Sequence, residues 1–332
     1  MAGMVSLADI RSAHRIVSKV ALRTPIVPLK FFERPETFLK CENLQRTGAF
    51  KIRGAYHRIS KLPKGCKGVT ASSSGNHAQA VAYAARLRGL PACIVMLDQS
   101  VPHKVEGTRS YGAEVILGGA TSVAIAERAE READERGFVF VPPFNDPDII
   151  AGQGTVGLEI LQDLRGVRSV IVQIGGGGLS SGVMTAVKES NPRIRVFGVE
   201  PAGAAKMRAA LDAGRVVTLP EVKTIADGLK PTRVSELTLE HVGRYADDVV
   251  SVSDDEILEA TRHLILREKL VVEPSGATAL AAVLAKKLKL PRGPAVAILS
   301  GGNADLGMIL GLKPSRTLGR GLERKPIKEE MT

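Results

Sequence analysis

Four consecutive glycines, at residues 175–178, are the clearest feature of this sequence from which chemistry can be inferred. They follow an apolar run at 170–174, and a helix-forming segment comes directly after them. Glycine lets backbone N–H groups approach a ligand closely, and the dipole of the following helix favours negative charge. The run has neither the G-x-G-x-x-G pattern of dinucleotide sites nor the G-K-[ST] ending of Walker loops. We therefore expect it to bind a phosphate group of a ligand that is neither NAD nor ATP.

Three further segments supply other chemical groups. Lys51 begins a predicted helix between Phe50 and Ile52, and an amine desolvated in apolar surroundings has a lowered pKa and can form a Schiff base. Residues 71–77 follow a predicted strand and open a helix, so their Ser and Asn side chains and N–H groups suit a carboxylate. A weaker signal of the same kind, residues 299–303, also follows a predicted strand.

These segments are positioned by an alternation of short apolar strands and longer amphipathic helices. A helix start with a capping-box pattern at Ser6 and Asp9 precedes them. The alternation predicts an α/β fold with two open, twisted, mainly parallel sheets that helices cover on both faces. The predicted strands span residues 26–29, 38–41, 68–71, 92–97, 113–117, 138–142, 167–174, 195–199, 249–252 and 295–299.

Composition excludes several classes of protein. The 332 residues suggest about two domains. The net charge of +11 is basic, but aromatic residues make up only 4% and there is no Trp, which argues against nucleic acid as a partner. The N-terminal residues lack the apolar run of a signal peptide, and no run is long enough to span a membrane. The three cysteines have no metal-ligand spacing, so we expect a cytoplasmic protein with free thiols.

Five segments together resemble the threonine dehydratase and serine racemase family of pyridoxal-phosphate enzymes, the β-family or fold type II. They are TGAFKIRGA, SSGNHAQAVAYAA, AGQGTVGLEI, GGGGLSSG and LSGGN, and they occur in the family's order over most of the chain. The resemblance implies pyridoxal 5′-phosphate in the cleft between two domains, and a homo-oligomer, either a dimer or a tetramer. It places the large cofactor-binding domain at 1–67 and 146–318, the small mobile substrate-loop domain at 68–145 and a basic tail at 319–332.

The same resemblance assigns roles to single residues. It implies that Lys51 forms the Schiff base and removes the proton from the substrate Cα, while Phe50 flanks the cofactor ring. Asn76 matches the partner of the cofactor's 3′-oxygen, and Ser300 matches the partner of the pyridine nitrogen. The phosphate would be held by the backbone of Gly175, Gly176, Gly177, Gly178 and Leu179, and the substrate carboxylate by the loop with Ser73, Ser74, Gly75 and His77.

The implied reaction is the dehydration of L-threonine or L-serine to the 2-oxo acid and ammonia by α,β-elimination. Two related enzymes stay open as alternatives, a serine racemase with side dehydratase activity and a 3-hydroxyaspartate ammonia-lyase. Ser74 matches the second proton donor of serine racemases, on the face opposite Lys51. A phosphate-binding or nucleic-acid-binding α/β protein without catalytic activity is a remote alternative, because it leaves Lys51, Asn76 and Ser300 unexplained.

One position departs from the family's pattern. Many racemase-like members bind Mg²⁺ through a Glu, a backbone carbonyl and an Asp. Glu200 and Ala204 match the first two ligands, but Lys206 stands where the Asp is expected. An ammonium at that position can pair with Glu200, so we expect no metal site here.

Overall fold

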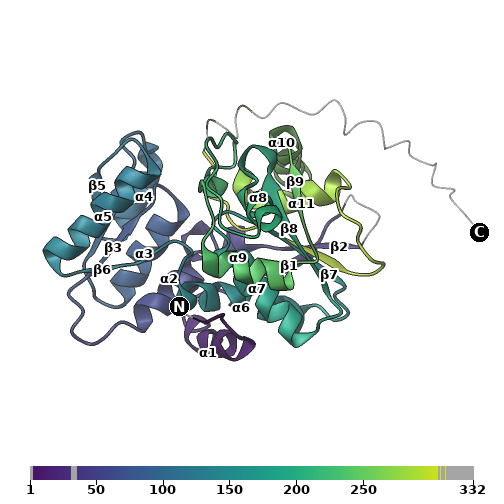
Figure 1. Cartoon of the computed structure of the whole chain (residues 1–332), viewed down its shortest axis with the longest axis horizontal. Coiled ribbons are helices and arrows are strands. Elements are labelled where there is room, and N and C mark those ends of the chain that lie inside the picture. Colours follow the sequence, from purple (N-terminus) through teal and green to yellow (C-terminus); the bar gives the residue numbers. More distant parts are fainter. Residues whose placement is uncertain (1–2, 31–35, 306, 308–310, 312–332) are drawn as a thin grey trace, which may run out of the picture.

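The computed structural model describes residues 3–30, 36–305, 307 and 311, and it contains two sheets (Figure 1). The six-strand sheet has the order β1-β2-β10-β7-β8-β9, and the four-strand sheet has the order β5-β4-β3-β6. Each neighbouring pair is parallel except β1 and β2. The strands are β1 (Ile26–Pro28), β2 (Thr37–Lys40), β3 (Val69–Ser72), β4 (Ala92–Met96), β5 (Glu114–Leu117), β6 (Val139–Phe140), β7 (Ser169–Gln173), β8 (Arg195–Pro201), β9 (Asp248–Val252) and β10 (Ala295–Ile298).

Helices lie between the strands in chain order. The α-helices are α1 (Leu7–Val17), α2 (Ile52–Ser60), α3 (Asn76–Leu87), α4 (Pro102–Ser110), α5 (Ser122–Arg136), α6 (Pro147–Asp163), α7 (Gly178–Ser190), α8 (Lys206–Ala213), α9 (Glu236–Tyr245), α10 (Asp254–His263) and α11 (Pro274–Leu284). Short helical turns are η1 (Glu42–Leu44), η2 (Arg46–Gly48), η3 (Ala202–Ala204), η4 (Asp227–Leu229) and the π-helical η5 (Leu264–Glu268). The predicted capping box is present, because Ser6 and Asp9 exchange hydrogen bonds at the start of α1.

Buried side chains alternate between the two faces of each sheet. In β4, Ile94 packs in the cluster that contains α3, whereas Val95 packs with residues of α5. In β7, Val170 packs with α6 and α7, whereas Ile171 packs with α11. This is the arrangement that a parallel sheet covered on both faces requires. The predicted α/β fold class with two mainly parallel sheets is therefore confirmed.

Each predicted strand has a counterpart in the structure, and the differences lie at the ends. The antiparallel pairing of β1 with β2 is a local hairpin at the edge of the six-strand sheet, which the apolar pattern did not show. The domain boundaries stay a prediction, and the tail at 319–332 lies outside the described residues. Within the described part of the chain, no helix has both the length and the apolar character needed to cross a membrane.

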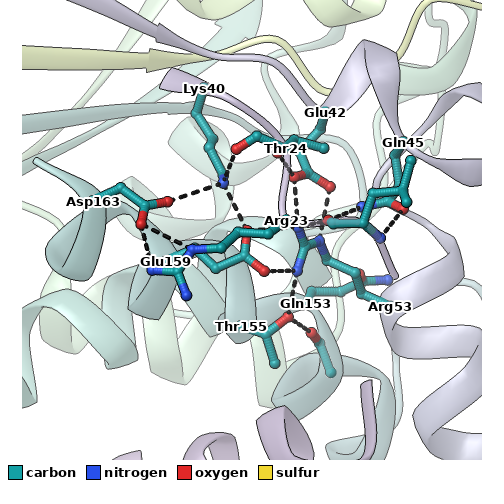
Figure 2. Close-up of polar contacts among 12 residues, drawn as sticks. Arg23, Thr24, Lys40, Glu42, Gln45, Arg53, Gln153, Thr155, Glu159 and Asp163 are labelled. Atoms are coloured by element: carbon teal, nitrogen blue, oxygen red, sulfur yellow. Dashed lines mark hydrogen bonds and ion pairs between the residues drawn. The ribbon is translucent and has the colours of Figure 1, made fainter. Parts of the chain in front are cut away.

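Helix α2 joins the two sheets, because it packs against α3 on one side and α6 on the other. Ile52 belongs to the apolar cluster around α3, whereas the next residue, Arg53, is directed toward α6. The Arg53 guanidinium donates to both oxygens of Glu42 at 2.7 and 2.8 Å and to both oxygens of Glu159 at 2.7 and 2.9 Å (Figure 2). Arg53 and Glu42 are fully buried.

A second buried cation completes this polar network. Lys40 Nζ donates to Glu159 Oε2 at 2.6 Å and to the carbonyl of Thr24 at 2.7 Å (Figure 2). The Thr24 hydroxyl donates to Glu42 at 2.5 Å. Burial alone would raise the pKa of Glu42, but the Arg53 guanidinium, together with Lys40 and the Thr24 hydroxyl, lowers it. Two buried cations therefore neutralise two buried carboxylates between β2, α2 and α6.

We predict that Arg53→Met lowers the free energy of unfolding by about 3–5 kcal/mol, because Glu42 and Glu159 would then lack their shared cation in the core. Urea unfolding followed by circular dichroism at pH 7 measures this change. The lowered pKa of Glu42 contributes stability above the ordinary glutamate pKa, and this contribution is lost as the pH falls through the lowered value. The difference between variant and parent should therefore shrink in acid.

Arg23→Met is the matched control for this measurement. The Arg23 side chain is 53% exposed and pairs with Asp163 at the edge of the same network. An exposed ion pair contributes about 0–1 kcal/mol, so this variant should stay close to the parent. If Arg53→Met were as stable as Arg23→Met, the buried network would not be what holds α2.

Candidate active site

Lys51 is the N-cap residue of α2, and the loop before it is fastened to the loop that contains Ser300. The Phe50 N–H donates to the carbonyl of Ser300 at 3.0 Å. Ala49 and Gly301 form an antiparallel β-bridge beside that hydrogen bond. The lysine and the serine that the sequence predicted for one site are therefore brought together from distant parts of the chain.

The amine of Lys51 lies in a desolvated position that is still partly accessible. Nζ donates to the carbonyl of Pro143 at 2.7 Å and stands 5.4 Å from the centre of the Phe50 ring. Desolvation by the surrounding protein lowers the pKa of Lys51 to about 8. A larger share of this amine is therefore neutral near pH 7 than for an ordinary lysine, and the neutral amine is the nucleophilic form.

Asn76 begins α3 and contacts two polar side chains from other loops. Its Nδ2 donates to Glu273 Oε1 at 2.5 Å, and its Oδ1 accepts from Asn303 Nδ2 at 2.8 Å. Asn303 Nδ2 also donates to the carbonyl of Thr47, in the turn before the lysine, at 2.8 Å. Burial raises the pKa of Glu273, although the hydrogen bond from Asn76 opposes this shift. Glu273 and Asn303, in loops next to the six-strand sheet, thus hold the side-chain amide of Asn76, at the start of the helix that follows β3 of the four-strand sheet.

The glycine turn, residues 175–178, lies between β7 and α7. Gly177 is the N-cap of α7 with φ of 100°, in the left-handed region that favours glycine, and no side chain caps this helix. A Cβ at Gly177 would lie 2.6 Å from the Cβ of Thr238, and a Cβ at Gly176 would lie 2.2 Å from the ring of Phe144. The turn therefore has no room for side chains, and its backbone N–H groups are what it can offer to a ligand. The residue before Phe144 accepts the Lys51 hydrogen bond, so the turn and the lysine meet the same segment.

The predicted carboxylate loop, residues 73–77, opens α3, which also has no side-chain cap. Open space surrounds the position of a Cβ at Gly75, and the Gly75 N–H donates to Ser73 Oγ at 3.3 Å. Ser74 Oγ accepts the Leu97 N–H at 2.9 Å and lies 2.7 Å from Ser100 Oγ. The Ser74 hydroxyl is therefore held against the end of β4.

Two predicted residues have side chains that point into the protein interior. His77 Nε2 lies 2.9 Å from the carbonyl of Val141, and burial, together with the charge of Lys51, lowers the pKa of His77 to about 3. The ring is therefore neutral at pH 7 and donates to that carbonyl. Leu179 packs in the core beneath the six-strand sheet. At His77 and Leu179, therefore, only the backbone N–H group can contact a ligand.

The expected pairing of Lys206 with Glu200 is confirmed. Lys206 Nζ lies 3.3 Å from Glu200 Oε1 and donates to the carbonyl of Ala204 at 2.7 Å, and both charged side chains are fully buried. Among the residues that the structure describes, no group of three or more His, Cys, Asp or Glu side chains is arranged to hold a metal ion. The oxygen atoms around Glu200 therefore surround an ammonium.

Sequence reasoning missed several residues that contact the site, among them Pro143, Phe144 and Glu273. Pro143 contributes only its carbonyl, which any residue type supplies, and Phe144 is identified only by its fit against the glycine turn. Glu273 directly precedes a helix-starting proline, but its burial, which sets it apart from surface carboxylates, is visible only in the structure. Its partner, Asn76, is distant in the sequence, so the pair could not be read from spacing.

Comparison with known proteins agrees with this geometry. Residues 17–301 match the family described as pyridoxal-phosphate dependent enzymes. The L-threonine ammonia-lyase of Thermotoga maritima is 43% identical over 96% of this chain and 79% of the relative. The catabolic L-threonine dehydratase of Escherichia coli strain K12 is 41% identical over 92% of this chain and 95% of the relative. The structure of maize serine racemase superposes with a TM-score of 0.89 at 39% identity, over 93% of this chain and 96% of that one.

The chain belongs to the pyridoxal-phosphate-dependent enzymes, and its fold is that of the fold type II members. The site fits this cofactor. The amine of Lys51 is desolvated but accessible. The N-terminus of α7 has no side-chain cap, and its glycine turn has no room for a Cβ at Gly176 or Gly177. An amine suits the cofactor's aldehyde, and the helix N-terminus suits its phosphate.

We predict that the rate at which pyridoxal phosphate attaches to the cofactor-free protein rises with pH up to about 8 and then levels off. The reason is that only the neutral amine of Lys51 reacts, and its pKa is lowered by desolvation. Stopped-flow absorbance across a pH series measures the rate. A rate that still rises steeply between about pH 9 and 10, as for an ordinary lysine, would contradict the desolvated position of this amine.

Proposed function

We propose that this chain is an ammonia-lyase that converts L-threonine, and L-serine as a second substrate, into the 2-oxo acid and ammonia. The observation that carries the proposal is the position of the Lys51 amine. It is desolvated, and the loop before it is bridged to the Ser300 loop. It contacts the same segment, residues 143–144, as the glycine turn at the uncapped start of α7. The names of the relatives from Thermotoga maritima and Escherichia coli support threonine as the substrate.

Lys51 supplies the group that moves a proton. Its amine, neutral in part because of desolvation, accepts the proton from the Cα of the amino acid. The Pro143 carbonyl, 2.7 Å from Nζ, then accepts a hydrogen bond from the ammonium that results. Pyridoxal phosphate, when bound, supplies the electron sink that stabilises negative charge at Cα. The proton taken from Cα and the β-hydroxyl leave together as one water, which returns Lys51 to its neutral amine, and a later hydrolysis consumes one water, so the net products are the 2-oxo acid and ammonia.

Other residues of the chain would hold the cofactor. The N–H groups of residues 175–179, at the positive end of α7, would bind the phosphate. Asn76, fixed by Glu273 and Asn303, would present its amide to the cofactor's 3′-oxygen. Ser300 would meet the pyridine nitrogen. A hydroxyl does not keep that nitrogen protonated as a carboxylate would, which favours β-elimination over transamination.

The substrate carboxylate would bind at the start of α3. The helix has no side-chain cap, and the space around Gly75 is open, so a carboxylate can reach the N–H groups of the first turn. The dipole of α3 favours an anion there. The loop 73–77, in the proposed small domain at 68–145, would thus orient the amino acid with its Cα above Lys51.

Lys51→Ala tests the proposal directly. We expect turnover of L-threonine to fall by about 10²–10⁴-fold or more, because the proton-transferring amine is removed. In the parent enzyme, borohydride should attach the cofactor permanently to the peptide that contains Lys51, which mass spectrometry detects. The variant should lose this attachment and keep its circular dichroism spectrum.

Lys61→Ala is the matched control, because Lys61 lies at the other end of α2, has a side chain that is 50% exposed and pairs with Asp148. It should retain parental activity. Elimination that persists in Lys51→Ala, with the cofactor attached to a different lysine, would overturn the assignment.

A second activity, serine racemisation, is favoured by the position of one hydroxyl. Lys51 reaches one face of the Cα plane, so racemisation needs a proton donor on the opposite face. Ser74 Oγ is held by the Leu97 N–H and by Ser100, next to the open start of α3. We propose racemisation as a side activity, with Ser74 as the second donor.

We predict that Ser74→Ala abolishes formation of D-serine from L-serine but retains most of the L-serine dehydration, because only racemisation needs the second donor. Chiral chromatography of the serine and a coupled assay of the 2-oxo acid measure the two activities in the same sample. Ser73→Ala, which removes the neighbouring hydroxyl, is the control and should keep their ratio. Absence of D-serine with the parent enzyme, or a parallel loss of both activities, would leave a simple ammonia-lyase.

The setting of the enzyme is part of the proposal. All three cysteines, Cys41, Cys66 and Cys93, are free thiols, which supports a reducing compartment such as the cytoplasm. The expected homo-oligomer stays a proposal that rests on the family resemblance. Size-exclusion chromatography with light scattering measures the number of chains.

A further inference from the structure

A fully buried lysine near the glycine turn is surrounded by oxygen atoms. Lys206 Nζ lies 2.7 Å from the Ala204 carbonyl, 3.2 Å from that of Leu229 and 3.5 Å from that of Ile174. The fourth oxygen is the carboxylate of Glu200 at 3.3 Å. An ammonium has three N–H donors and no lone pair, whereas a neutral amine would direct its lone pair at one of these oxygens.

The carboxylate in this cage is itself fixed by backbone donors. Glu200 accepts the N–H of Met207 and the N–H of Arg208, each at 2.9 Å, and thereby closes the N-terminus of α8. Burial raises the pKa of Glu200 and lowers that of Lys206, and the attraction between the two charges opposes both shifts. Together with the hydrogen bonds that fix Glu200, the contacts of Lys206 make a built unit of four oxygens around one nitrogen.

The cage joins three segments that meet at the glycine turn. Ile174 directly precedes Gly175, Ala204 ends η3 and Leu229 ends η4. The backbone of η4 also contacts the turn, because a Cβ at Gly175 would lie 3.0 Å from the Gly228 carbonyl. Removing the ammonium would leave three buried carbonyls and a carboxylate without their shared donor, next to the proposed phosphate site.

We propose that Lys206 is a tethered cation, which permanently occupies an oxygen cage of the kind that binds a metal ion and positions the glycine turn. A carboxylate with several carbonyl oxygens is a donor set that suits a hard cation. The ammonium brings the positive charge as part of the chain, so the protein needs no metal ion here. Only the effect on cofactor affinity rests on the proposed function, whereas the occupancy of the cage does not.

The first arm of the test uses the parent holoenzyme and Mn²⁺ as the probe. Electron paramagnetic resonance should detect no stoichiometric Mn²⁺ binding, and EDTA should leave the melting temperature unchanged. One Mn²⁺ bound per chain, with a melting temperature that falls on chelation and recovers with Mn²⁺, would overturn the proposal. This arm needs no variant, so it decides even if a substitution prevents folding.

The second arm is Lys206→Asp. It places a second carboxylate beside Glu200 and the three carbonyls, so we expect one Mn²⁺ per chain and a melting temperature that rises with Mn²⁺. Glu200→Gln added to this variant should weaken Mn²⁺ binding at least tenfold. Arg208→Asp makes the same charge change two residues further along α8, on a side chain that is 41% exposed, and should bind no stoichiometric Mn²⁺.

Cofactor affinity distinguishes this proposal from the proposed function. Without Mn²⁺, Lys206→Asp should bind pyridoxal phosphate at least tenfold more weakly than the parent in an absorbance titration, and Mn²⁺ should restore most of the loss. A folded Lys206→Asp that binds no Mn²⁺ and keeps parental stability and cofactor affinity would overturn the tethered cation. A parent that behaves as expected here but releases no 2-oxo acid would overturn only the proposed function.

Discussion

The buried guanidinium of Arg53 is the constraint on which the arrangement of the site depends. Charges without water are tolerated only when the geometry of their partners is nearly complete, and Arg53 reaches both oxygens of two carboxylates from different parts of the chain. A shift of α2 by one residue would withdraw the guanidinium from both. The register of α2 is therefore fixed, and with it the direction of Lys51, two residues earlier. Helix α2, which joins the two sheets, is thus also the helix that cannot shift along its axis without losing these hydrogen bonds.

Two desolvated lysines, Lys51 and Lys206, show how the surroundings decide what one residue type does. Lys51 has a single carbonyl partner and the face of an aromatic ring, so desolvation prevails and lowers its pKa to about 8. Lys206 is surrounded by four oxygens, including a carboxylate, and its charge is used to hold loops together. The amine of Lys51 has few hydrogen-bond partners and can react. The amine of Lys206 has its N–H donors occupied and cannot react.

The sequence predicted those parts of the fold whose physics is local. The strands follow from β-branched apolar runs, and the glycine turn follows from four consecutive glycines, of which Gly177 has φ of 100°, in the left-handed region that favours glycine. The polar network around Arg53 could not be predicted, because its partners, Glu42 and Glu159, carry no pattern that distinguishes them from surface carboxylates. The same holds for Glu273 beside Asn76 and for the carbonyl of Pro143. The pairing of Lys206 with Glu200 was predictable only because the family resemblance marked both positions.

The strand order has a consequence for the growing chain. The four-strand sheet is built from β3 to β6, which are made one after another, whereas β10 is made after every other strand of the described residues and lies between β2 and β7. Until β10 leaves the ribosome, the six-strand sheet lacks an interior strand, and the loop before Lys51 lacks the partner that Ser300 and Gly301 provide. Translation must therefore run past residue 303 before the reactive amine has its surroundings. A chain that ends before β10 cannot assemble this centre, so the topology by itself restricts the chemistry to chains that contain this strand.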